Sequence, residues 1–316
     1  MRGRRARAVV RPSRGGRLRA AAAGGGEPRR GARAGPRPPR RRCVRDVRLR
    51  GAGRRRPGGP GGLGRPGRAG GEGDMTFLSE RRPGLLVLVD PSRTEAPQAA
   101  AVARAAQAAG AAAVMIGSSF DGTRNTHLIA KALRTGAPGF PVLLFPGSAM
   151  QLTEDVDLVL FLSLISGRNA QYLIEEHVRA APFFQRHQVP TLSTGYILVD
   201  GGRVTSVEAV SQTRPLPADK PELAAAHALA AKLIGMRAVY LDAGSGADRP
   251  VTAEVIRACR AVLVEPDELQ FVGGGIKSPA QAAAARAAGA DFVVVGTVVE
   301  QGPPEGLAAY VRAVRG

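Results

Sequence analysis

The sequence has no tryptophan and only two cysteines, Cys43 and Cys259, in 316 residues. Two isolated cysteines exclude a disulfide framework and a cysteine-based metal site, and they fit a reducing, cytoplasmic setting. No apolar run approaches the roughly 20 residues that span a bilayer. The longest run, residues 158–165, is interrupted by Ser163. We therefore expect a soluble body without a transmembrane segment.

Residues 1–74 contain no lysine but 23 arginines, against four acidic residues. They account for the whole net charge of +19, so residues 75–316 form a neutral body. A segment of arginine, glycine, proline and alanine buries too little apolar surface to offset the entropy of ordering, and we expect it to be disordered. It also has no aromatic residue to stack on bases, so we expect no nucleic-acid binding, although arginines alone can neutralise phosphates.

The composition of residues 1–74 is also what GC-rich DNA ahead of a gene would encode. The segment has neither the apolar core of a secretory signal nor the amphipathic, serine-rich pattern of a transit peptide. We therefore interpret Met75 as the true start and residues 75–316 as the functional domain. Nucleic-acid binding through the extension is the alternative function that is not enzymatic.

Short apolar runs alternate with alanine-rich segments from residue 85 onward. Runs that are nearly continuous in valine, isoleucine and leucine are typical of strands buried on both faces of a parallel sheet. The intervening segments, such as 98–109 and 279–288, have the spacing of crossover helices. There are eight runs, at residues 85–89, 112–116, 142–145, 158–162, 191–199, 238–241, 270–272 and 292–295.

Eight strand–helix units in about 230 residues indicate an α/β (β/α)8 TIM barrel, with an open doubly wound sheet as the competing fold. The barrel is favoured because glycine, serine and aspartate follow the predicted strands and would meet at the C-terminal rim. Residues 203–221 break the alternation with three prolines, so we expect a long loop there. The histidines follow no strand and have no metal-ligand spacing, and we interpret them as surface or packing residues: His127, His177, His187 and His227.

Two glycine turns, the run 273–275 and Gly296, follow the seventh and eighth predicted strands. Glycine lets backbone N–H groups approach an anion closely, and a helix N-terminus that follows adds partial positive charge. Loops after these two strands form a recurrent phosphate site in barrels. The spacing therefore predicts a phosphate site, rather than turns that serve only tight packing.

Two further polar groups follow predicted strands. The run 242–247 offers a carboxylate, a hydroxyl and free amides, which suit a small polyol phosphate. Asp90 and Ser119 end the first two strands, and we expect them on the opposite side of the rim. Mg²⁺ takes one or two carboxylates and completes its shell with water and substrate phosphates, so this pair points to a diphosphate. A structural cap is the competing role for Asp90.

Seven short motifs follow one another in order, at residues 88–91, 116–119, 145–148, 194–198, 240–246, 272–276 and 295–296. Each motif alone is weak, but this order and spacing are specific. Together they resemble the geranylgeranylglyceryl phosphate synthases and their bacterial PcrB-type relatives. The resemblance spans nearly all of residues 85–316.

This resemblance implies a Mg²⁺-dependent prenyltransferase of ether-lipid biosynthesis. Such an enzyme joins a polyprenyl diphosphate, with geranylgeranyl diphosphate favoured, to the primary hydroxyl of sn-glycerol 1-phosphate and releases diphosphate. By matching positions, Asp90 and Ser119 would hold the Mg²⁺, and Asp242 would take the proton of the acceptor hydroxyl. A homo-oligomer with peripheral membrane contact is also implied. The residues implied to bind glycerol 1-phosphate are Tyr240, Leu241, Asp242, Ala243, Gly244, Ser245, Gly246, Gly274, Gly275, Gly296 and Thr297.

The chain departs from the family pattern in four places. The family usually has Glu where Asp242 stands, often Asn at Thr297, often Gly-Gly-Ser at 117–119, and Lys at Arg93 in many members. These replacements are chemically related, so we expect activity to survive. The prenyl tail needs an apolar trench, and the candidates, for each of which ordinary core packing is the alternative, are Phe145, Phe161, Leu164, Tyr172, Phe183, Phe184 and Tyr196.

The competing enzymatic hypothesis is another phosphate-binding barrel, an isomerase or lyase of a sugar phosphate. Such enzymes generally need a general acid and a general base that face each other across the barrel. Here only Asp90 and Asp242 are well placed, and the rim lacks lysine between the first and sixth strands. The sequence therefore favours the prenyltransferase.

Overall fold

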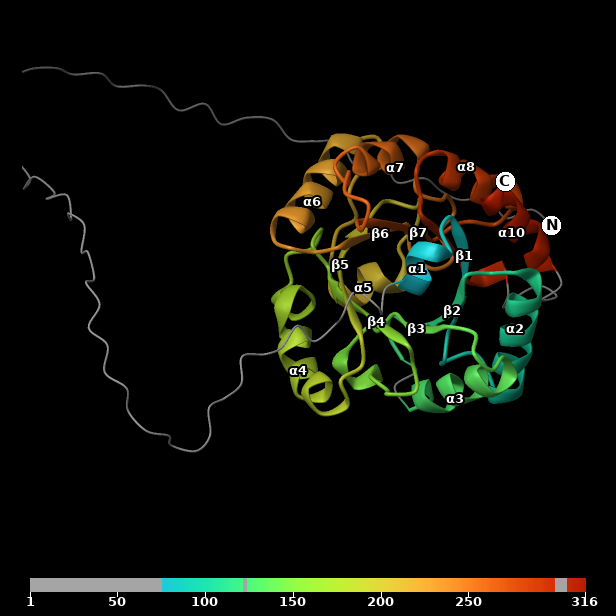
Figure 1. Cartoon of the computed structure of the whole chain (residues 1–316). Helices are drawn as coiled ribbons and strands as arrows, with labels where there is room; N and C mark the ends of the chain where they lie inside the picture. The colour runs from blue at the N-terminus through green and yellow to red at the C-terminus, as the bar shows by residue number, and fades with distance from the viewer. Residues whose placement is uncertain (1–75, 122–123, 299–305) are drawn as a thin grey trace, which may run out of the picture. The chain divides into compact units, whose positions relative to one another are not determined.

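A closed parallel barrel forms the core of the protein, whose computed structural model describes residues 76–121, 124–298 and 306–316. The strands follow one another in chain order, and β1 pairs with β8 to close the sheet (Figure 1). The predicted TIM barrel is therefore confirmed, and an open sheet is excluded. The expected disorder of residues 1–74 lies outside the described residues. The strands are β1 Gly84–Val89, β2 Ala113–Ile116, β3 Val142–Leu144, β4 Leu158–Ser163, β5 Thr191–Leu198, β6 Ala238–Asp242, β7 Leu269–Gly273 and β8 Phe292–Val295.

Each strand begins and ends within one residue of its predicted run. The accuracy follows from burial on both faces. In β1, Leu86 is packed among the side chains that fill the barrel, whereas Leu85 and Val87 belong to the layer between strands and helices. Because both faces of the strand are buried, in the barrel interior and under the helices, every position is apolar. A strand with one face in water would instead alternate apolar and polar residues.

Helices surround the barrel and pack through small side chains. In α2, the buried positions are Ala99, Val102, Ala103 and Ala106, and alanine lets the helix approach the strands closely. Within the described residues, no helix is long and apolar enough to cross a membrane. The helices around the barrel are α2 Ala96–Ala109, α3 Thr126–Gly136, α4 Glu176–His187, α6 Pro221–Leu233, α7 Ala253–Arg260, α8 Pro279–Ala287 and α10 Leu307–Arg315.

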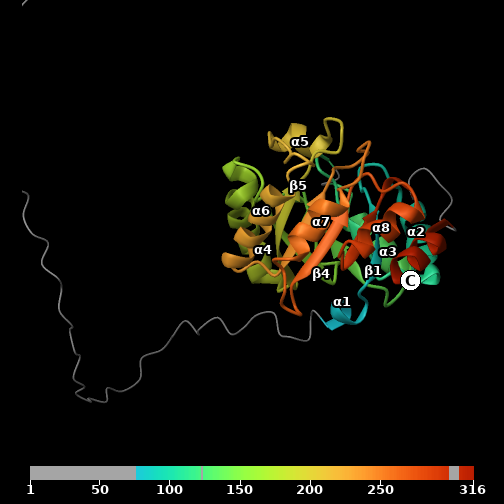
Figure 2. The same ribbon diagram turned by 90° about the horizontal axis from the view of Figure 1, so that it is seen from above.

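The outer layer is thin between α3 and α4. The connection from β3 to β4 holds only a short 3-10 helix, η2 (Ala149–Gln151), in place of a full crossover helix. The predicted loop at 203–221 also differs from expectation, because it contains a short helix, α5 (Ser206–Ser211). Figure 2 shows α5 beyond one end of the barrel and α1 (Thr76–Glu80) beyond the other. Leu78 of α1 is fully buried against the barrel interior.

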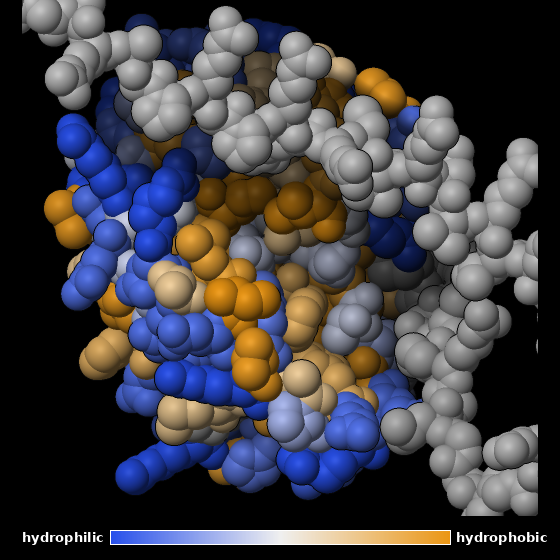
Figure 3. Space-filling model, turned by 90° about the vertical axis from the view of Figure 1, so that its left-hand side faces the viewer, coloured by the Kyte–Doolittle hydropathy of each residue, from blue (hydrophilic) through white to orange (hydrophobic). Residues whose placement is uncertain are grey.

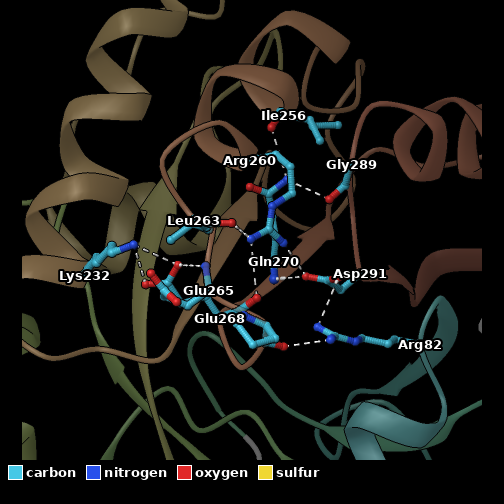
Figure 4. Close-up of polar contacts among 11 residues, drawn as sticks. Arg82, Lys232, Ile256, Arg260, Leu263, Glu265, Glu268, Gln270, Gly289 and Asp291 are labelled. Atoms are coloured by element: carbon cyan, nitrogen blue, oxygen red, sulfur yellow. Dashed lines mark hydrogen bonds and ion pairs between the residues drawn. The ribbon is translucent and has the colours of Figure 1, made fainter.

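A network of polar contacts joins the N-terminal ends of β7, β8 and β1 (Figure 4). Asp291 accepts hydrogen bonds from the backbone N–H of Gln270 at 2.7 Å and from Arg260 Nη1 at 2.8 Å. Arg82 Nη1 lies 3.8 Å from the other carboxylate oxygen. Arg260 also donates to the carbonyl of Leu263. This carboxylate therefore holds the start of β7 against the start of β8.

Replacing Asp291 with alanine should lower the free energy of unfolding by about 2–3 kcal/mol, because the variant leaves two partly buried donors without their charged acceptor. Urea unfolding measures the change. The matched control is Asp267→Ala, whose partner Arg237 lies 3.3 Å away in an exposed pair. Exposed pairs contribute about 0–1 kcal/mol, so equal losses in the two variants would contradict the assigned role.

Candidate active site

A pocket lies at the C-terminal ends of the strands, as the sequence predicted. It brings together residues that follow β1, β2, β6, β7 and β8, and therefore segments from both halves of the chain. The predicted site residues that line it are Asp90, Ser119, Tyr240, Asp242, Ser245, Gly246, Gly274, Gly275, Gly296 and Thr297.

Three residues of the predicted acceptor site do not line the pocket. Leu241 and Ala243 are buried in the layer between the strands and the helices. Gly244 instead packs against Thr205, and its backbone N–H donates to Asp242 Oδ1 at 2.8 Å. Leu241 is therefore part of β6 itself, Ala243 and Gly244 shape the loop that follows, and the side chains of Leu241 and Ala243 face the core.

Asp242 is the most buried carboxylate of the pocket, with only 8% of its surface exposed. Its Oδ2 accepts a hydrogen bond from the Tyr196 hydroxyl at 2.5 Å. Burial raises the pKa of Asp242, and the hydrogen bonds from Tyr196 and from the Gly244 N–H lower it, with burial the larger effect. A carboxyl group whose pKa is raised, and whose oxygens keep free lone pairs, is suited to accept a proton.

The residues around Asp242 form an aromatic cluster. The ring of Tyr240 stacks on Phe145 with centroids 4.6 Å apart, and Tyr196 lies 5.7 Å from both rings. Burial, followed by the negative charge of Asp242, raises the pKa of Tyr196 and of Tyr240 well above the usual value. Both phenols therefore stay protonated. Tyr196, predicted as a wall of an apolar trench, does line the pocket but acts as a hydrogen-bond donor there.

The turn after β7 packs directly against the turn after β6. Gly274 has φ +76°, and a Cβ atom there would clash with Asp242 Oδ1 and lie 2.6 Å from Gly244 N. Gly275 has φ +68°, and its Cβ would lie 2.5 Å from the carbonyl oxygen of Arg249. Both positions require glycine, and consecutive residues of this kind are found in backbone sites that hold anions.

Two details differ from the glycine prediction. Gly296 does not adopt a left-handed conformation, and a Cβ there would meet Leu88 only at 3.5 Å, an ordinary contact. Gly296 lines the pocket, but its backbone conformation does not require glycine. The N-terminus of α8 is also already capped, because Ser278 Oγ accepts from the N–H of Gln281 at 3.3 Å. One amide of that first turn is therefore already occupied by a side chain.

Asp90 lies beside the glycine turn after β8 and not across the barrel from it, and Ser119 follows β2, one strand further on. The closure of the sheet pairs β1 with β8, so Asp90 follows a strand next to the one that ends before Gly296. Asp90 Oδ1 accepts from the N–H and Oγ of Ser92, at 2.8 and 2.7 Å. Oδ2 lies 4.0 Å from Arg93 Nε and is the oxygen left for a cation. Among the described residues, no group of three His, Cys, Asp or Glu could hold a metal, so any ion here would complete its shell with substrate oxygens.

The pocket continues as an apolar arm along β4. Consecutive residues 159–162 line it, and these residues alternate between the barrel interior and the outer face. The arm therefore extends to the space between β4 and α4, where Phe161 meets Phe184 in an edge-on contact at 5.5 Å. Figure 3 views the molecule from the side of α4 and α6, and apolar side chains surround a hollow on this face. The trench candidates that line the pocket are Phe145, Phe161, Leu164, Tyr172, Phe184 and Tyr196.

Three residues at or near the pocket have positions that the sequence analysis did not predict. Phe183 is not part of the pocket wall, since it packs against the outer core and His187. His177 lines the pocket, its ring centroid lies 4.3 Å from that of Phe161 in a tilted arrangement, and its Nε2 lies 2.6 Å from the carbonyl oxygen of Leu162. Glu176 also lines it and accepts from the N–H of Ala149 at 2.7 Å. Both follow a π-helix, η3 (Gln171–Glu175), and no sequence signal marks that irregular turn.

Comparison with known proteins decides the family. A family model described as the PcrB family matches residues 75–314. The chain belongs to the PcrB family. Its relatives include the geranylgeranylglyceryl phosphate synthase of Methanopyrus kandleri, 41% identical over 243 residues, which cover 77% of this chain and 99% of the relative. The synthase of Spirosoma linguale is 50% identical over 175 residues, 54% of this chain and 69% of the relative. This PcrB-family chain is therefore a prenyltransferase, as predicted.

Solved structures agree with the family. The (S)-3-O-geranylgeranylglyceryl phosphate synthase of Thermoplasma acidophilum, crystallised with its substrate sn-glycerol-1-phosphate, has a TM-score of 0.70 and 30% identity over 76% of this chain and 96% of that one. The synthase of Thermoplasma volcanium has a TM-score of 0.68 and 26% identity, covering 77% and 96%. The competing isomerase or lyase hypothesis is not favoured by these relatives.

The contact between the two turns predicts a difference between two glycines of this PcrB-family pocket. Gly274→Ala adds a clash to a strained backbone and should lower the free energy of unfolding by roughly 3 kcal/mol or more. Gly246→Ala has the same strain, with φ +72°, but nothing lies within 4 Å of its Cβ, so about 1 kcal/mol is expected. Urea unfolding of both variants tests this, and similar losses would show that the close contact is wrong.

Tyr196→Phe removes a donor that lowers the pKa of Asp242. When the pKa of a carboxyl group is higher in the folded than in the unfolded protein, the free energy of unfolding falls as pH rises from the unfolded pKa, about 3.9, through the folded one. The variant should raise the folded-state pKa further. Its free energy of unfolding should therefore fall below that of the wild type by about 1.5–3 kcal/mol at neutral pH, and by less at mildly acidic pH.

The control for this pH dependence is Tyr172→Phe. Tyr172 also lines the pocket, but its hydroxyl donates weakly to the carbonyl of Val210 at 3.5 Å and does not contact Asp242. Unfolding should show a pH-independent change in that variant. A pH-independent change in Tyr196→Phe as well would mean that its hydroxyl does not act on the carboxyl group.

Proposed function

We propose that this enzyme joins a polyprenyl diphosphate, with geranylgeranyl diphosphate favoured, to the primary hydroxyl of sn-glycerol 1-phosphate in ether-lipid biosynthesis. The observation that carries the proposal is the two-part pocket. Its polar part contains Asp242 and the glycine turn, and its apolar arm follows β4 to the outer face of the barrel. A small polar acceptor and a long apolar donor need such a combination. The names of the relatives support the same substrates.

In the proposed reaction the acceptor lies at the glycine turn, with its phosphate on the backbone amides near Gly274 and Gly275. The Asp242 carboxylate orients the acceptor hydroxyl and takes its proton. An ether bond forms between that oxygen and the first prenyl carbon, while the allylic C–O bond breaks and diphosphate leaves with the electron pair. The hydrogen bond from Tyr196 holds the carboxylate in place during this step.

Mg²⁺ is the cofactor that fits the donor set at Asp90 and Ser119. The fit rests on Asp90, whose Oδ1 is fixed by Ser92 while Oδ2 remains for a hard cation. When bound there, the ion would neutralise negative charge on the leaving diphosphate. The same proposal includes a cytoplasmic homo-oligomer that meets the membrane peripherally, and an active domain of residues 75–316.

The test incubates the full chain with labelled sn-glycerol 1-phosphate, Mg²⁺ and prenyl diphosphates of several lengths, and measures extractable ether product. A protein of residues 75–316 should be equally active, whereas nucleic-acid binding through the extension would be lost from it. Asp90→Ala should lower Mg²⁺-dependent turnover about 100-fold or more, because charge stabilisation of the leaving group is lost.

The control is Asp267→Ala, which removes an exposed carboxylate paired with Arg237 at the other end of the barrel. Its turnover should match the wild type. Absence of ether product with every donor would overturn the proposed function. Normal Mg²⁺-dependent turnover of Asp90→Ala would overturn the metal assignment alone.

A further inference from the structure

Carboxylates outnumber cations in the pocket, although both proposed substrates are anions. Asp90, Glu176 and Asp242 line it, and Lys277 is the one lysine or arginine among the described residues of its wall. We propose that Lys277 is the cationic member of the acceptor-phosphate site and sets the affinity for the acceptor. This inference rests on the proposed function and adds a residue that the glycine motifs do not include.

The backbone of Lys277 is fixed directly beside the glycine turn. Lys277 stands two positions after Gly275, and its N–H donates to Gln281 Oε1 at 2.7 Å. Gln281 belongs to the first turn of α8, where its own N–H is capped by Ser278. A side chain that begins here therefore starts from the edge of the phosphate turn, on a rigid helix end.

The ammonium group of Lys277 is available for an anion. Its Nζ lies 3.4 Å from the carbonyl oxygen of Asp248, at the outer limit of a hydrogen bond. Within the described part of the chain it has no carboxylate within 4.0 Å, whereas the nearby Arg249 lies 3.6 Å from Asp200. The contact with Asp248 also joins the segment after β6 to the segment after β7, which are the two sides of the acceptor site.

Other positive charge at this end of the pocket is limited. One first-turn amide of α8, that of Gln281, already donates to Ser278 and is not available to an anion. A phosphate bound at Gly274 and Gly275 would lie near the buried Asp242, and like charges repel. A mobile ammonium at the rim offsets this repulsion and raises the encounter rate with an anion, and both effects weaken as salt increases.

The experiment measures steady-state kinetics of the full chain with Lys277→Met and Lys277→Arg, at low and high salt. Lys277→Met should raise the KM for sn-glycerol 1-phosphate roughly tenfold, as expected for one charge-assisted hydrogen bond. The kcat and the KM for prenyl diphosphate should stay unchanged, and the increase should shrink at high salt. Lys277→Arg should restore most of the affinity, because it keeps the charge.

The control is Arg286→Met, which makes the same change of charge near the other end of α8, at an exposed position. It should leave both KM values unchanged. An unchanged KM for the acceptor in Lys277→Met, or an equal rise in the KM for prenyl diphosphate, would overturn the proposal.

Calorimetric titration with sn-glycerol 1-phosphate, and separately with inorganic phosphate, distinguishes this inference from the proposed function. Weaker binding of both probes to Lys277→Met than to Arg286→Met supports the phosphate role, even if the wild type makes no ether product. Equal binding of inorganic phosphate to wild type and Lys277→Met would overturn it.

Discussion

Gly274 touches the turn after β6 so closely that no Cβ atom fits between them. This contact holds the Asp242 carboxyl group at a fixed distance from the glycine turn. The barrel fixes the position of this contact. Asp242 of β6 and Gly273 of β7 are paired in the sheet, and the Ala243 N–H donates to the Gly273 carbonyl oxygen at 3.2 Å. At the other end of β7, Asp291 binds the N–H of Gln270. Interactions at both ends of one strand therefore determine where the proposed acceptor can lie.

The same packing explains the electrostatics of the pocket. Asp242 is buried beside Tyr196 and Tyr240 and is largely shielded from water, and this burial raises its pKa. The Tyr196 hydroxyl and the Gly244 N–H partly compensate, which keeps the carboxyl group within reach of its ionised form. The loop after β6 folds back on the Asp242 side chain through the Gly244 N–H, at 2.8 Å.

Strand positions could be predicted from the sequence because each strand is buried on both faces, and a run such as 292–295 leaves no alternative. Rim residues could also be predicted, because parallel strands deliver their C-terminal ends to one side. The place of Asp90 on the rim was predicted wrongly, although closing eight strands in chain order already pairs β1 with β8. Asp90 and Gly296 are distant in sequence, and only the β1–β8 pairing makes them neighbours. Backbone angles were also hidden, so Gly296 and Gly274 looked alike although only Gly274 has a positive φ. His177 was interpreted as a surface or packing residue because it follows no strand, whereas it lines the pocket from the start of α4.

The thin outer layer between α3 and α4 has a physical consequence for the apolar arm. A full crossover helix after β3 would cover the outer side of the barrel beside β4, where the half-buried Phe161 lines the arm. The connection from β3 to β4 instead holds only η2, and Glu176 fixes η2 to α4 through the N–H of Ala149. Apolar surface left uncovered costs about 25 cal/mol for each Å² that water contacts. In the proposed reaction a prenyl tail covers this surface, so the free energy that a missing helix would have contributed to folding becomes available for binding the donor.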